Sequence, residues 1–64
     1  MTTYTKGQTV QFHSMYEGEG IVTGTIISAR TERGYRGTIT TEYYIRQDDG
    51  GYQHRSDNHV IGLA

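Results

Sequence analysis

Cysteine, proline and tryptophan are all absent from this chain of 64 residues. The lack of cysteine excludes a disulfide framework and a zinc site built on thiolates, and it fits a reducing compartment. No apolar run approaches the ~18 residues that a membrane span requires, and the first residues contain neither a basic nor an apolar targeting segment. We therefore expect a cytoplasmic protein that makes no membrane contact.

An excess of charge of one sign is also lacking, since six Lys and Arg residues oppose seven Asp and Glu residues and the formal net charge is −1. The field of the whole molecule therefore does not attract nucleic acid, and such binding would require a local basic patch. A chain of about 60 residues has a small core, and with neither disulfides nor a metal, oligomerisation or docking on a partner is the remaining stabiliser. We expect one domain over residues 1–64, with residues 1–6 as a frayed lead-in.

What the chain does contain, nine glycines, six tyrosines and many threonines, is typical of a turn-rich all-β domain. Its longest apolar and β-branched run, residues 18–29, predicts one long strand. Gly24 in the middle of this run indicates a bulge or a sharp bend, around which the other strands would wrap as a small barrel. Val10 and Phe12 alternate with polar residues and predict a strand over 8–14 with both side chains inside.

The second half of the chain contains weaker strand signals separated by clear turns. Alternation places Tyr43 and Ile45 on one face of a strand and Glu42, Tyr44 and Arg46 on the other, so at least one of the two tyrosines faces outward. Asp48 to Gly51 (Asp-Asp-Gly-Gly) predict a tight hairpin, because these residues accept left-handed dihedral angles. Residues 56–59 are expected to form one helical or 3₁₀ turn. The further strands are predicted over residues 40–47, 52–55 and 60–63.

Four short segments carry a resemblance to a known superfamily: KGQTV (6–10), GEGIVTGTI (18–26), DDGG (48–51) and SDNHVIGL (56–63). Together they resemble the small Tudor- and KOW-type members of the SH3-like superfamily over residues 7–63. The resemblance implies an all-β, five-stranded SH3-like barrel with a single 3₁₀ turn before the last strand. Such barrels bind peptides, nucleic acids or methylated ligands, form oligomers and occasionally catalyse reactions, so the fold alone leaves the function open.

The most basic stretch of the chain is a predicted loop of mobile character over residues 31–38. Within residues 29–37, Arg30, Arg33 and Arg36 recur every three residues around Tyr35. Guanidinium groups contact phosphates in a bidentate manner and a tyrosine stacks on a base, so the pattern predicts a non-catalytic module that binds RNA or single-stranded DNA. The alternative is a solvated hairpin arm whose arginines keep it soluble.

In an SH3-like arrangement, Tyr16, Tyr35 and the Asn58-His59 turn would rim one cleft, the usual ligand position of that fold. Exposed tyrosines favour binding surfaces, whereas cross-strand packing is the preferred interpretation for Tyr43 and Tyr52. Arg46 or Arg55 would add a further contact to nucleic acid. The predicted ligand-binding residues are Tyr16, Arg30, Arg33, Tyr35, Arg36, Arg55 and His59.

Isoleucines that are out of phase with the core predict a second kind of surface. If Val22 and Ile26 face the core, Ile27 and Ile21 face outward and favour self-association. The alternative is that a bend at Gly24 changes the face and buries both halves of the strand. The second functional hypothesis is accordingly a protein-interaction or oligomerising accessory protein, of the kind that phages and mobile elements encode. The predicted interface residues are Ile21, Ile27 and Tyr44.

No motif predicts a metal site, a cofactor or catalysis. His13, His54 and His59 lack the cysteine or carboxylate spacing of a zinc site. His54, Ser56 and Asp57 include the residue types of a catalytic triad, but neighbours in the sequence do not provide triad geometry. An enzyme is therefore the third hypothesis, and it would need an active site shared between subunits.

Overall fold

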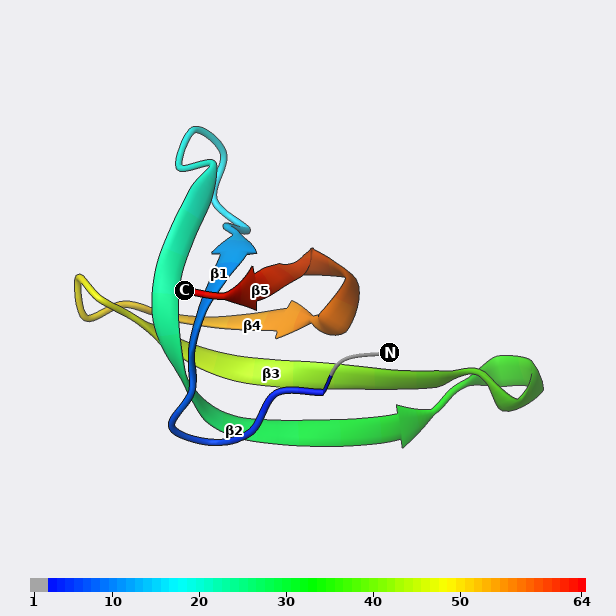
Figure 1. The fold of residues 1–64 in the computed structure, drawn as a ribbon. Helices are drawn as coiled ribbons and strands as arrows, with labels where there is room; N and C mark the ends of the chain where they lie inside the picture. Colours follow the sequence, from blue (N-terminus) through cyan, green and yellow to red (C-terminus); the bar gives the residue numbers. More distant parts are fainter. Residues whose placement is uncertain (1–2) are drawn as a thin grey trace.

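The computed structural model describes residues 3–64 as a single antiparallel sheet of five strands (Figure 1). The sheet order is β4-β3-β2-β1-β5, and the described residues contain no α-helix, which confirms the all-β class. The edge strands β4 and β5 are not paired with each other, so the sheet is open and the closed barrel stays a prediction. No helical segment within residues 3–64 has the length and apolarity to cross a membrane. The elements are β1 (Thr9–His13), β2 (Ile21–Arg33), η1 (Tyr35–Gly37), β3 (Ile39–Gln47), β4 (Tyr52–Ser56), η2 (Asp57–His59) and β5 (Val60–Leu63).

Most of the expected elements are confirmed within one residue, and two differ. The hairpin between β3 and β4 is tight: Gly50 has φ 98° and donates its N–H to the carbonyl of Gln47 at 2.9 Å. The turn η2 precedes β5 as expected, but it is not the single 3₁₀ turn, because η1 is a second one. β2 begins at Ile21 and continues to Arg33, so the predicted loop 31–38 is wrong in its first three residues.

The long strand β2 contains a bulge, although not at the glycine. Ile26 pairs with Ile45 and Ser28 with Tyr44, which leaves Ile27 as the extra residue. Gly24 instead lies where β2 and β3 approach closely: a Cβ atom there would be 2.6 Å from the carbonyl oxygen of Arg46. The bulge changes which side chains face the core, so Ile26 is buried while Ile27 is half-buried.

The core is formed on one face of the curved sheet and is covered in part by the N-terminal segment. Tyr4 donates its backbone N–H to the hydroxyl of Tyr43 at 3.1 Å, and the two rings meet edge to face at 5.8 Å. Gly7 donates its N–H to the carbonyl of Ile26 at 2.8 Å. The prediction of a frayed lead-in is therefore wrong from Tyr4 onward. Residues 1–2, which the prediction also covers, lie outside the described residues. The buried apolar residues are Tyr4, Val10, Phe12, Ile26, Tyr43 and Ile45.

A buried glutamine fixes the loop between β1 and β2. Gln53 is 1% exposed, accepts the N–H of Met15 at 2.8 Å and donates its side-chain amide to Ser14 Oγ at 3.0 Å. Both ends of its amide are thereby satisfied, as burial of a polar group requires. The loop is therefore attached to the sheet by polar contacts, and its apolar residues Met15 and Tyr16 stay exposed.

Candidate functional site

The most distinctive region is a two-stranded arm, residues 28–40, made by the second half of β2, η1 and the start of β3. Every residue of the arm is exposed, and the arm extends beyond the rest of the sheet (Figure 1). Its β2 residues, Ser28 to Arg33, pair with β3 from Tyr44 to Ile39, and only the last two of these β3 residues, Ile39 and Thr40, belong to the arm. A hairpin on its own is marginally stable in water. The arm thus gains no core burial of its own and presents both of its faces to solvent.

The arginines of the arm point in different directions. Arg30 and Arg33 lie on opposite faces of β2, because successive side chains of a strand alternate. Arg30 forms an ion pair with Glu32 on its own face. Arg36 lies at the tip with φ 61°, and its guanidinium is 5.7 Å from the centre of the Tyr35 ring. Within residues 3–64, neither Arg33 nor Arg36 is within ion-pair distance of a carboxylate.

The other predicted ligand-binding residues are distributed over the molecule. Tyr35 is 85% exposed at the arm tip, whereas Tyr16 belongs to the loop between β1 and β2, which lies at another end of the molecule (Figure 1). His59 is half-buried in η2. Arg55 is half-buried in β4, and its Nε is buried without a hydrogen-bond partner in the described part of the chain. The structure therefore does not bring Tyr16, Tyr35 and His59 together around one cleft.

An aromatic row occupies the face of β3 and β4 opposite the core, hereafter the outer face. The rings of Tyr44 and Tyr52 stack with centroids 5.3 Å apart and planes 16° apart, and the ring of His54 lies 4.5 Å from that of Tyr44. His54 Nδ1 is 3.3 Å from Glu42 Oε1. Sequence reasoning missed this row, although the tight hairpin and the alternation along β3 and β4 together place these three rings on one face.

Two arginines lie on the outer face near the row. Arg46 is the cross-strand partner of Tyr52, and Arg30 is the partner of Glu42. Cβ atoms of such partners are about 5 Å apart. The outer face therefore continues without interruption from the aromatic row to the arm, with a guanidinium beside each part.

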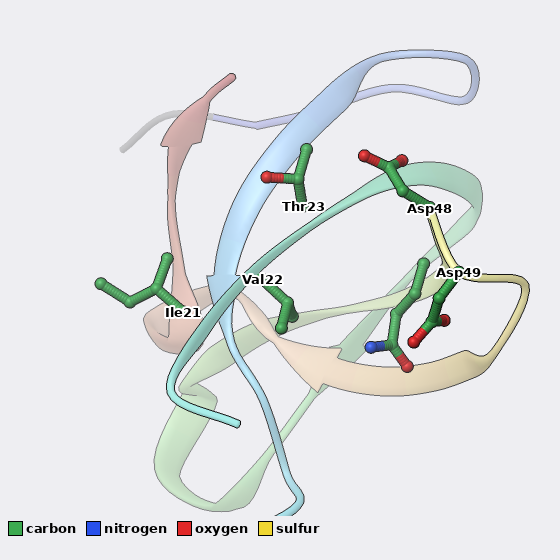
Figure 2. Close-up of a pocket in the computed structure, with 6 residues that line it drawn as sticks. Ile21, Val22, Thr23, Asp48 and Asp49 are labelled. Atoms are coloured by element: carbon green, nitrogen blue, oxygen red, sulfur yellow. The ribbon is translucent and has the colours of Figure 1, made fainter. Parts of the chain in front are cut away.

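A pocket of about 300 Å³ lies between the start of β2 and the hairpin that joins β3 and β4 (Figure 2). Asp48 donates its backbone N–H to the carbonyl of Thr23 at 3.2 Å, and the Asp49 carboxylate accepts the N–H of Gly51 at 3.0 Å. Two carboxylates at the rim oppose the binding of an anion. Among residues 3–64 no group of three or more His, Cys, Asp and Glu side chains is arranged to hold a metal ion. The pocket is lined by Ile21, Val22, Thr23, Gln47, Asp48 and Asp49.

The residues predicted for self-association do not form one patch. Ile21 is 56% exposed and pairs with His13 of β1, whereas Tyr44 is half-buried inside the aromatic row. Ile27 is half-buried in the bulge between them. Comparison with protein families, curated proteins and solved structures gives no match. The function therefore has to be inferred from the arm and the outer face.

Proposed function

We propose that this protein is a non-catalytic module that binds single-stranded nucleic acid, RNA or single-stranded DNA, through its arm. The observation that carries the proposal is the exposed tip, where Arg33 and Arg36 have no carboxylate partner in the described part of the chain and Tyr35 is 85% exposed. Guanidinium groups bind phosphate oxygens in pairs, and an exposed tyrosine ring stacks on an unpaired base.

The charge distribution supports a local contact rather than a large electrostatic field. With a net charge of −1 the chain has no long-range attraction for a polyanion, and the carboxylates of Asp48 and Asp49 lie in the hairpin, outside the arm. Two phosphate contacts to a single strand give a salt slope of about −1.4, so binding weakens roughly sevenfold between about 50 and 200 mM salt. We expect weak binding with moderate salt dependence.

We also propose that the open sheet is an SH3-like arrangement. The meander of β1 to β4, the addition of β5 beside β1, the bulged β2 and the turn η2 before β5 support this proposal. In such an arrangement one bent strand belongs to both halves of the sheet, which leaves its far end available as an arm.

Fluorescence anisotropy with short labelled oligo-dT and oligo-U strands tests the proposed function at low and moderate salt. Arg36→Ala weakens binding and Arg33→Ala/Arg36→Ala weakens it further, because the phosphate contacts at the arm tip are lost. Lys6→Ala is the matched control, since it removes one exposed positive charge outside the arm. If the double variant binds as well as the native chain, the arginines are solvated surface and the proposal is wrong.

Self-association is a second candidate, and a specific observation favours it. Ile21, Ile61 and Leu63 are 56%, 48% and 60% exposed, and they lie on the strands flanking β1. Exposed apolar side chains of this size favour contacts between protein surfaces. Light scattering over a range of protein concentrations tests it: Ile21→Ser shifts a concentration-dependent mass toward the monomer, whereas a constant monomeric mass excludes self-association.

A further inference from the structure

Within the aromatic row on the outer face, one ring contacts both of the others, and the other two rings form the ends of the row. Tyr44 contacts both of the other rings: its ring stacks on that of Tyr52 and lies 4.5 Å from that of His54. Tyr52 and His54 each contact Tyr44, and Tyr52 retains 49% exposure on the edge strand β4. A further planar group can extend the row at one of its two ends.

The charges around the two ends differ. His54 lies beside Glu42, whose carboxylate oxygen is 3.3 Å from its ring nitrogen and would repel a phosphate group. Tyr52 lies across from Arg46, which is exposed and has no carboxylate within ion-pair distance among residues 3–64. The carboxylates of the adjoining hairpin, Asp48 and Asp49, line the pocket together with the buried Gln47, whose side chain lies on the face of β3 opposite to Arg46. At the Tyr52 end, an exposed ring and a guanidinium group thus occupy paired positions on neighbouring strands.

We infer that Tyr52 and Arg46 form a nucleotide-binding site that is separate from the arm tip. An unpaired base stacks on the open face of Tyr52, while the Arg46 guanidinium contacts its phosphate. This inference rests on the proposed function and deepens it, because a base that stacks on Tyr52 cannot remain stacked and paired within a duplex. Arg30 lies on the same outer face, between this site and the tip.

An abasic oligonucleotide combined with a substitution of Tyr52 distinguishes this inference from binding by the arm, where Tyr35 also offers a ring for stacking. Anisotropy titrations compare a labelled oligo-dT with an abasic strand of equal length, which carries the same phosphates but no bases. The native chain binds the oligo-dT about tenfold more tightly, as expected for one base stacked on a tyrosine. Tyr52→Leu reduces this preference for the oligo-dT, whereas Tyr52→Phe keeps it, because phenylalanine retains the ring. Arg33→Ala/Arg36→Ala weakens binding of both strands but retains a preference for the strand with bases.

Each other outcome overturns a defined part of the proposal. Equal binding of the two strands by the native chain overturns the stacking site and leaves the arm as a phosphate contact. If Tyr52→Leu binds the oligo-dT in undiminished preference to the abasic strand, the bases stack elsewhere and the Tyr52 site is overturned. Failure of the native chain to bind either strand at low salt overturns the proposed function together with this inference. Circular dichroism and thermal unfolding of Tyr52→Leu establish that the variant is folded.

Discussion

The two halves of β2 belong to one strand but serve the protein in different ways. The first half, up to the bulge at Ile27, packs between β1 and β3 and contributes the buried residues Gly24 and Ile26. The second half pairs with β3 alone, and all of its residues from Ser28 to Arg33 are exposed. Stability is therefore concentrated before the bulge and candidate binding residues after it, so substitutions can separate the two.

The largest effect is expected from Gly24→Ala in the packed half. A Cβ atom would lie 2.6 Å from the backbone carbonyl oxygen of Arg46, and a backbone atom cannot move aside without separating β2 from β3. We expect the free energy of unfolding to fall by about 3 kcal/mol. Urea denaturation measures this change. Gly62→Ala is the control, because a Cβ atom there meets nothing within 4 Å, and a similar loss in both variants would contradict the close-approach explanation.

A smaller loss is expected from Gln53→Leu, which tests how the loop between β1 and β2 is attached. The substitution removes the acceptor for the Met15 N–H and the donor to Ser14 Oγ. We expect a loss of about 2 kcal/mol in the free energy of unfolding, since two part-buried hydrogen bonds are lost and the Met15 N–H is left without its acceptor. Exposed Gln11→Leu in β1 is the matched control and should change stability by less than about 0.5 kcal/mol. Equal stability of Gln53→Leu and the native chain would show that the loop is held by other contacts.

Tyr43→Phe tests the contact between the N-terminal segment and the core. The ring remains, but the hydroxyl that accepts the Tyr4 N–H is lost. We expect a decrease of about 1 kcal/mol in the free energy of unfolding. Faster amide hydrogen exchange at Tyr4 in the variant is the specific signature, and unchanged exchange there would mean that the segment is held by ring packing alone.

The smallest effect on stability is expected from Arg33→Ala/Arg36→Ala in the arm. Both side chains are exposed and lack ion-pair partners among the described residues, so the free energy of unfolding should change by less than about 0.5 kcal/mol. In the native chain, hydrogen exchange should be fast from Arg30 to Arg33 and slow from Val22 to Ile26, since local opening of the arm disturbs no core contact. Equal protection of the amides from hydrogen exchange along the whole of β2 would contradict the difference in stability between its two halves.

Local patterns in the sequence were sufficient for the strands whose neighbours are close in the chain. The alternation around Val10 and Phe12 and the Asp-Gly hairpin depend on period-two burial and on left-handed dihedral angles, and both are confirmed. Within the arm, residues 31–38 lack an apolar period, and the sequence therefore predicts a loop over them. Strand pairing there is held by backbone hydrogen bonds, which leave no apolar pattern in the side chains.

For the candidate site, the sequence identified the residue types but not their grouping. Arg30, Arg33 and Arg36 are equally spaced along the chain, yet strand alternation and the left-handed Arg36 place them in different directions. The aromatic row depends on the register between β3 and β4, in which Arg46 faces Tyr52 and Tyr44 faces His54. Such a grouping involves residues six to ten positions apart and becomes visible once the register is known.

By itself the sequence determined the all-β class, the tight hairpin and the buried face of β1, because these follow from residue-level preferences and short-range periodicity. The tertiary structure decided that the bulge lies at Ile27 and that the neighbouring strands β2 and β3 approach each other closely at Gly24. It also decided that Tyr4 is buried and that residues 28–40 form an exposed arm. The physical reason is that these features depend on which distant segments meet, and the balance of contacts between them is not encoded in any local pattern.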